Sequence, residues 1–304
     1  MSRTVLYIYA TLLTILLAFI LLSSSSEPKQ RALAEWSAAG LPQQIENVPI
    51  EKGYSFAGED LEMDNFDVRE RLERELMTNA YWHSNTVRLI KHANRYFPVI
   101  EPILAKNGVP DDFKYLAVAE SGLANVVSPA GATGYWQFLR DVGKEYGLEV
   151  NGEIDQRYDI EASTESACKL LLKLKDRFGS WSMAALAYNM GGANLKRAIE
   201  RQKPERFSDL NLNEETSRYV FRIVAIKTIL QAPGEFGFQL RPEDLYQPFT
   251  DTKKIKVTGA VSSWADFAEK YDLSYRMLKV YNPWLRDYKL TNKTGKEYLI
   301  TVPE

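Results

Sequence analysis

The chain has 304 residues, of which 45% are hydrophobic and 26% charged, so its composition is that of a globular protein and excludes a fully disordered chain. Its 38 Lys and Arg nearly balance its 40 Asp and Glu, and the formal net charge of -2 removes the general electrostatic reason to expect nucleic acid as a partner. One cysteine, Cys168, and two histidines, His83 and His92, exclude a disulfide framework within the chain and nearly exclude a His/Cys zinc site. A metalloenzyme would have to rely on carboxylates alone, and we predict neither a metal nor another cofactor.

The N-terminal segment, residues 1–22, is strongly apolar. Residues 5–22 carry no charge and follow a basic residue, Arg3. At ~1.5 Å per residue this run spans about 27 Å of helix, close to the thickness of a bilayer core. We predict a signal anchor that makes the membrane a partner. The alternative is a signal peptide cleaved among Ser23 to Ser26, because small residues follow the apolar run. Either way the rest of the chain is exported.

The central part of the chain is predicted to be helical. Residues 23–65 are polar and interrupted by proline and glycine, which is typical of a tether. In residues 66–230 apolar side chains recur at helical spacing and strands are hard to find, so we expect a mainly α domain. One of its helices is expected to have Ser163 or Thr164 as N-cap and to end at Gly179.

The C-terminal part has a different pattern. Residues 231–253 are rich in proline and glycine and are predicted to be a linker. Within residues 254–304 we expect a strand at 255–257, a helix, a second short helix after Ser274, and a last strand at 297–302. The fold class is therefore mainly α, with a small βααβ domain at the end of the chain.

One carboxylate stands in an apolar setting. The segment from Pro110 to Gly122 is predicted to be a buried helix, and Glu120 lies at the end of its hydrophobic stripe. Desolvation disfavours an ionised carboxylate and raises its pKa, which allows a glutamate to act as a general acid near neutral pH. The alternative is that Glu120 merely pairs with a basic residue or caps a neighbouring helix.

Three further patches could complete a site around such an acid. They lie at residues 128–138, 186–192 and 215–220. In the first, the flat rings of Tyr135 and Trp136 near amide and hydroxyl groups would suit a sugar. Each patch is weak alone, since Tyr188 or Tyr219 in a helix is also typical of a core tyrosine.

Together these motifs resemble a known family. The ordered set AESGL, SPAGATGYWQF, ALAYNMGG and ETSRYV is similar to the lysozyme-like catalytic domain of lytic murein transglycosylases, most closely the membrane-bound type D group. The likeness covers about residues 66–230 and implies a lysozyme-like helical fold. One departure is Met190, where a small residue is more usual before the glycine.

The resemblance also implies roles for individual residues. Glu120 corresponds to the family's single catalytic acid and base, and Tyr219 to a tyrosine that faces the catalytic carboxyl. The substrate-binding residues that we predict are Ser128, Tyr135, Gln137, Tyr188, Asn189 and Tyr219. The prediction for Tyr135 rests on its flat ring, and the predictions for the other residues rest on the motifs. The segment 155–159 is interpreted as structural, with Asp159 as a helix cap.

The C-terminal domain, residues 254–304, resembles a LysM module, a βααβ unit that binds glycans containing N-acetylglucosamine. The best-matched part is Asn282-Pro283-Trp284, and the pattern departs at residues 259–262, before the first helix. The resemblance implies glycan binding. The alternative is a domain of the same shape that only packs or spaces.

The mechanism implied by the resemblance needs only one protein carboxylate. Glu120 would protonate the glycosidic oxygen of peptidoglycan and then take the proton of the sugar's own 6-hydroxyl, which leaves a 1,6-anhydromuramoyl end. Two alternatives stay open: a hydrolytic muramidase with the same acid, and a peptidoglycan-binding protein that does not cut. The partners predicted are peptidoglycan strands and the membrane, in the periplasm or cell envelope, and no protein partner is indicated.

Overall fold

The computed structural model describes residues 47–50 and 53–304. Residues 48–304 form one compact unit. The predicted signal anchor and most of the predicted tether lie outside the described residues. Within the part of the chain that the structure describes, no helix has the length and apolarity to cross a membrane.

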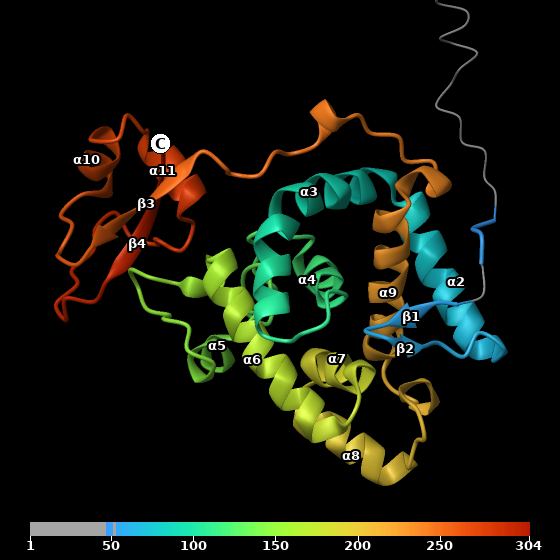
Figure 1. Cartoon of the computed structure of the whole chain (residues 1–304). Helices are drawn as coiled ribbons and strands as arrows, with labels where there is room; N and C mark the ends of the chain where they lie inside the picture. The colour runs from blue at the N-terminus through green and yellow to red at the C-terminus, as the bar shows by residue number, and fades with distance from the viewer. Residues whose placement is uncertain (1–46, 51–52) are drawn as a thin grey trace, which may run out of the picture. The chain divides into compact units, whose positions relative to one another are not determined.

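Residues 66–231 form a helical domain, which confirms the mainly α prediction (Figure 1). Helix α4 lies against α3 and α9, α9 also packs on α2 and α7, and α6 packs on α3 and α7. The buried residues of α4 and α9 form the centre of the hydrophobic core. The helices are α2 (Phe66–Tyr81), α3 (His83–Lys106), α4 (Phe113–Ser121), α5 (Arg140–Glu145), α6 (Ile160–Phe178), α7 (Trp181–Met190), α8 (Gly192–Gln202) and α9 (Glu214–Gln231).

Helix α4, which carries Glu120, is held at both ends. It begins after Asp112, whose carboxylate accepts a hydrogen bond from the Lys227 ammonium of α9 at 2.7 Å. It ends at Gly122, whose φ of +62° is readily adopted by glycine and whose N–H bonds to the Val118 carbonyl, as the sequence predicted. These two ends fix where Glu120 lies along the core.

Helix α6 begins earlier than the sequence suggested. Its N-cap is Asp159, whose carboxylate accepts from the N–H groups of Glu161 and Ala162 at 2.9 and 3.1 Å. This confirms the predicted Asp159 cap, while the expectation of Ser163 or Thr164 as N-cap is wrong. Both hydroxyls lie inside the first turns and donate to backbone carbonyls four residues back. The predicted end at Gly179 is confirmed by its φ of +82°.

A short hairpin corrects the predicted tether. Strands β1 (Ser55–Phe56) and β2 (Glu59–Asp60) pair antiparallel, and the buried Phe56 ring lies 5.1 Å from the Phe113 ring. The Glu59 carboxylate accepts from the N–H groups of Trp181 and Ser182 at 2.6 and 2.9 Å, which caps α7. Residues 53–61 therefore belong to the helical domain, whose boundary lies before residue 66.

The C-terminal domain has the predicted βααβ order. Its elements are β3 (Thr252–Val257), α10 (Trp264–Glu269), α11 (Tyr275–Tyr281) and β4 (Tyr298–Pro303), and β3 pairs antiparallel with β4. Ser274 caps α11 through a bond from the Met277 N–H, as expected. Asn282, in the best-matched part of the LysM resemblance, is fully buried and bonds to both backbone groups of Thr301. That residue thus serves the fold of the domain.

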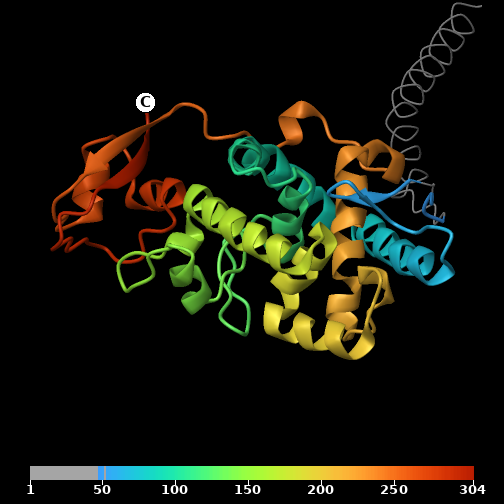
Figure 2. The ribbon, with the colours of Figure 1, turned by 60° about the horizontal axis from the view of Figure 1, so that its bottom comes forward.

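The C-terminal domain is not separated from the helical domain by a free linker. Within the predicted linker, Phe238 is buried, and the carbonyls of Tyr246 and Gln247 accept from side chains of α3. Figure 2 shows the C-terminal domain beside the start of α6, where Lys254 pairs with Glu161 at 2.8 Å. The two domains are in direct contact.

Candidate active site

Glu120 lies in the last turn of α4 and faces α9. Its side chain is partly exposed, as is that of Ala119, while residues 113–118 of α4 are buried. Its carboxylate oxygen Oε1 accepts a hydrogen bond from the hydroxyl of Tyr219, which is only 2% exposed. The predicted pairing of this carboxyl with a tyrosine across two helices is therefore present in the structure.

The surroundings of Glu120 change its acidity. Burial raises the pKa of its carboxyl to about 7, and the nearby negative charge of Glu215 acts in the same direction. The hydrogen bond from Tyr219 and the positive charge of Arg222 oppose this rise in pKa. At neutral pH the protonated and ionised forms of Glu120 are thus both populated, so this carboxyl can donate a proton as well as accept one.

A second tyrosine lies near the acid. The hydroxyl of Tyr188, on α7, donates to the Trp136 carbonyl at 2.6 Å. Burial and the negative charge of Glu120 hold the pKa of the Tyr188 phenol well above its usual value. The next residue, Asn189, accepts from the Thr216 hydroxyl at 2.9 Å and so links α7 to α9. The structure brings Glu120, Tyr188 and Tyr219 together from three helices.

Ser128 and Gln137 both stabilise the loop between α4 and α5. The Ser128 hydroxyl oxygen accepts from the Ala132 N–H at 3.1 Å. Gln137 adopts a φ of +50°, and its amide donates to the carbonyls of Val126 and Gly134 at 3.1 and 2.8 Å. These contacts define a compact turn, and they give both predicted site residues a structural part in the loop.

The two aromatic rings of this loop do not offer flat faces to a ligand, which corrects the expectation for Tyr135. Its side chain is 4% exposed and its ring lies 5.0 Å from that of Tyr96. Trp136 is fully buried and its indole N–H donates to the Thr164 hydroxyl at 2.8 Å. The sequence could not show this, because a glycine-rich turn can direct aromatic rings inward or outward. Their backbone carbonyls, however, accept from Ser121 and Tyr188 beside the acid.

One buried cluster near the site was not predicted. Glu75, on α2, is 1% exposed, and its carboxylate pairs with the guanidinium groups of Arg218 and Arg222 on α9. These arginines flank Tyr219 in the helix. The signal was present in the sequence, because Glu75 continues the helical stripe of Val68 and Leu72, just as Glu120 ends its own stripe. The described residues hold no group of three or more His, Cys, Asp or Glu side chains placed to bind a metal ion.

Two parts of the chain match known protein families. Residues 97–211 match a family described as Transglycosylase SLT domain, and residues 253–304 match one described as Soluble lytic transglycosylase C-terminal LysM-like domain. The first match includes Glu120, the loop with Gln137, and Tyr188. Tyr219 lies just beyond it.

Two curated relatives match a larger part of the chain. The chain is 29% identical over 263 residues, 83% of its length, to Membrane-bound lytic murein transglycosylase D of Escherichia coli strain K12. The same values hold for the protein of that name from Escherichia coli O6:H1 strain CFT073. The chain spans 55% of each relative. These matches show that the chain combines an SLT transglycosylase domain with a C-terminal LysM-like domain and is a distant homologue of membrane-bound lytic murein transglycosylase D.

Proposed function

We propose that the protein is a peptidoglycan lytic transglycosylase that cleaves the β-1,4 bond between N-acetylmuramic acid and N-acetylglucosamine and forms a 1,6-anhydromuramoyl end. The observation that carries this proposal is Glu120 itself. Its carboxyl has a pKa of about 7, accepts a hydrogen bond from Tyr219, and lies within the segment that matches the SLT domain.

In the first step, protonated Glu120 donates its proton to the glycosidic oxygen as the bond to the anomeric carbon breaks. The developing positive charge at that carbon is stabilised by the 2-acetamido group of the N-acetylmuramic acid, so a second protein carboxylate is not required. Because burial raises the pKa of Glu120 to about 7, a substantial fraction of the carboxyl is protonated at neutral pH.

In the second step, the ionised Glu120 takes the proton of the sugar's 6-hydroxyl while that oxygen bonds to the anomeric carbon. The carboxyl returns to its protonated form and no water is consumed. The hydrogen bond from Tyr219 favours the ionised form of Glu120 between the two steps. Ring closure within one sugar also gains from the high effective concentration of a positioned neighbouring group.

The products of digestion test the proposal. Purified sacculi incubated with the full chain should release soluble muropeptides whose masses correspond to anhydro ends. Release of fragments with reducing ends would instead identify a hydrolytic muramidase. Binding to sacculi without any release would identify a glycan-binding protein that does not cut.

Replacement of Tyr219 by phenylalanine tests the support of the acid. Tyr219→Phe removes a hydrogen bond that lowers the pKa of Glu120, so the pKa of Glu120 should rise. Activity, which should fall as this carboxyl ionises, should therefore begin to fall at a higher pH than in the parent. Activity at neutral pH should fall by about 10-fold, because the ionised carboxylate loses a hydrogen bond that contributes about 1.5 kcal/mol. The measurement is the pH profile of muropeptide release. Tyr188→Phe controls for the pH shift alone: its hydroxyl bonds to the Trp136 carbonyl rather than to Glu120, so the pH at which activity falls should stay that of the parent whatever the rate. An unchanged profile in Tyr219→Phe would contradict this role.

We further infer that peptidoglycan is the binding partner of both domains and that the protein acts in the cell envelope. The matches to SLT and LysM-like families support the first point. The uncharged run at residues 5–22 and the name of the relatives, which describes them as membrane-bound, support an anchor in the membrane.

A further inference from the structure

We propose that Arg157 is a positioning residue for the active-site loop, residues 126–138, and that the LysM-like domain supports catalysis by holding the segment that carries Arg157. The proposal rests on the cleavage activity proposed above. It assigns the LysM-like domain an effect on the catalytic step in addition to any binding of glycan.

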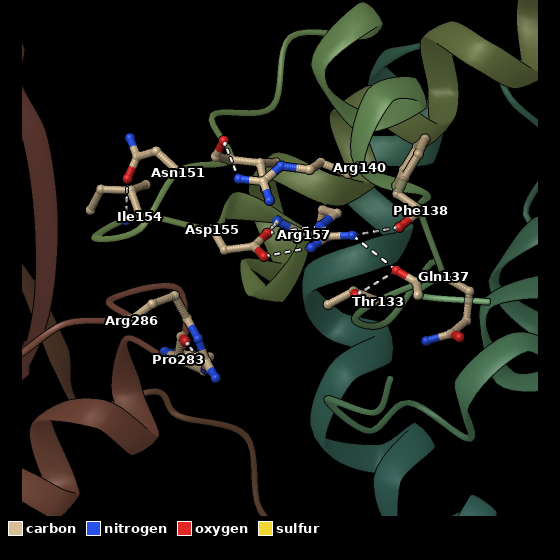
Figure 3. Close-up of polar contacts among 12 residues, drawn as sticks. Thr133, Gln137, Phe138, Arg140, Asn151, Ile154, Asp155, Arg157, Pro283 and Arg286 are labelled. Atoms are coloured by element: carbon tan, nitrogen blue, oxygen red, sulfur yellow. Dashed lines mark hydrogen bonds and ion pairs between the residues drawn. The ribbon is translucent and has the colours of Figure 1, made fainter. Parts of the chain in front are cut away.

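Arg157 is fixed in place by a buried ion pair with Asp155. Its Nε and Nη2 atoms donate to the two carboxylate oxygens of Asp155 at 3.0 and 2.7 Å, and each side chain is 10% exposed. A pair with two parallel hydrogen bonds sets the plane of the guanidinium group as well as its position. The remaining nitrogen, Nη1, is thereby directed at the active-site loop (Figure 3).

Nη1 of Arg157 holds the loop at two points. It donates to the carbonyls of Gly131 and Phe138, both at 3.2 Å. The Gly131 carbonyl also accepts from the Thr133 hydroxyl, and the Phe138 carbonyl also accepts from the Thr133 N–H, both at 3.0 Å. The backbone contact is equally close, because a Cβ atom added to Gly134 would lie 1.8 Å from the Arg157 carbonyl oxygen. Arg157 therefore acts on both sides of the turn that contains Gln137.

The same loop contacts the neighbours of the acid. The Ser121 hydroxyl, one residue after Glu120, donates to the Tyr135 carbonyl at 2.7 Å. The Tyr188 hydroxyl donates to the Trp136 carbonyl at 2.6 Å. A shift of the loop would move two consecutive carbonyl groups that set the end of α4 and the second tyrosine of the site. Misplacement of about 1 Å can cost an enzyme ~10²-fold in rate.

The LysM-like domain holds the other side of Asp155 and Arg157. Ile154 is 1% exposed and belongs to the hydrophobic core of that domain. The Asp155 N–H donates to the Trp284 carbonyl at 2.9 Å, and the Arg286 N–H donates to the Glu153 carbonyl at 2.8 Å. These bonds form a short antiparallel pairing around Ile154 and Leu285, directly beside the ion pair.

Side chains extend this contact on both sides of the pairing. The Arg286 guanidinium lies 4.1 Å from the centre of the Tyr158 ring. Glu149 pairs with the Lys296 ammonium at 2.5 Å and accepts from the Tyr298 hydroxyl at 3.1 Å. The segment 149–158 is thus held at its start, middle and end by the LysM-like domain. A module on a flexible linker would act only through local substrate concentration, whereas this arrangement reaches the active-site loop.

The first test uses two substitutions in the full chain. Arg157→Lys keeps the positive charge beside Asp155 but cannot reproduce the planar group that reaches both carbonyls. Ile154→Ala removes side-chain atoms from the LysM-like core and leaves Arg157 unchanged. Cleavage of a short soluble glycan fragment is measured per folded molecule. Each variant should lower kcat, Arg157→Lys by about 10-fold, with KM changed by less than about 2-fold. Arg276→Ala, an exposed arginine on α11, is the control and should retain the parent kcat.

The second test asks whether both substitutions act along one route. If the LysM-like domain acts through Arg157, Ile154→Ala should have little additional effect on kcat in the Arg157→Lys background. Parent values of kcat in the folded single variants would overturn the positioning role. Independent, fully additive effects would overturn the route through Arg157. Absence of cleavage by the parent chain would overturn the proposed function and this inference together, so the outcomes are distinguishable.

Discussion

Glu120→Gln is expected to lower muropeptide release from purified sacculi by at least ~10²- to 10⁴-fold. Glutamine keeps the size of the side chain and can still accept the hydrogen bond from Tyr219, but it has no proton to donate near neutral pH. Because the same group is proposed to act first as acid and then as base, the loss should lie at the upper end of that range. The measurement is the initial rate of release at pH 6, where the parent carboxyl, with a pKa of about 7, is mostly protonated.

The same substitution should not destabilise the fold. The folded-state pKa of Glu120 is about 7 and its ordinary value is 4.5, so between these values the folded chain retains a proton that the unfolded chain has lost. Stability therefore falls as the pH rises from 4.5 to 7, by as much as roughly 3 kcal/mol at ~1.4 kcal/mol per pH unit. Glutamine avoids this penalty, so Glu120→Gln should raise the thermal midpoint at pH 8 and change it little at pH 4.

Glu75→Gln is the matched control for this stability effect. Glu75 is likewise a helical carboxylate of the domain core, but it is fully buried and paired with two arginines, so its substitution should lower the thermal midpoint. For Glu120→Gln itself, release of muropeptides at near the parent rate would show that another group is the catalytic acid. Unfolding of Glu120→Gln would show that the carboxyl has a structural role.

Gly134→Ala is expected to be the most destabilising small substitution in the active-site loop. Gly134 has a φ of +81°, and a Cβ there would lie 1.8 Å from the Arg157 carbonyl oxygen, a backbone atom that cannot move without its segment. Gly131 in the same loop has a φ of +79° but open space around an added Cβ. Gly131→Ala should therefore lower the free energy of unfolding only by the ~1–2 kcal/mol that the left-handed conformation costs a residue with a Cβ atom. Gly134→Ala should lower it by more than about 4 kcal/mol.

Thermal or urea unfolding of the two alanine variants measures this difference. The Gly134 variant should also lose activity, because the loop must separate from Arg157 to accommodate the methyl group. Equal stability of the two variants would mean that the loop and Arg157 are not in the close contact described here.

The parts of the fold that the sequence predicted well are those determined by neighbouring residues. Helix α4 and its end follow from a local apolar stripe and from Gly122, and the position of Glu120 in that stripe indicated its raised pKa. The βααβ order of the C-terminal domain follows in the same way from short periodic segments and serine caps. Such signals need no knowledge of distant contacts.

The parts that the sequence missed depend on residues far apart in the chain. Glu59 caps α7 across more than a hundred residues, so the hairpin around it was assigned to a tether. Ile154 belongs to the core of a domain that begins about a hundred residues later, which local periodicity does not reveal. The inward direction of the Tyr135 ring depends on Tyr96 of α3. In each case the deciding interaction is tertiary.

Digestion of sacculi in water enriched in ¹⁸O tests the central claim most directly. Ring closure by the sugar's own 6-hydroxyl uses no water, whereas hydrolysis adds one water oxygen at each new muramic acid end. The account predicts that the parent chain releases anhydro ends without ¹⁸O and that Glu120→Gln releases almost none. New reducing ends that carry one ¹⁸O atom each, or anhydro ends formed by Glu120→Gln at the parent rate, would contradict it.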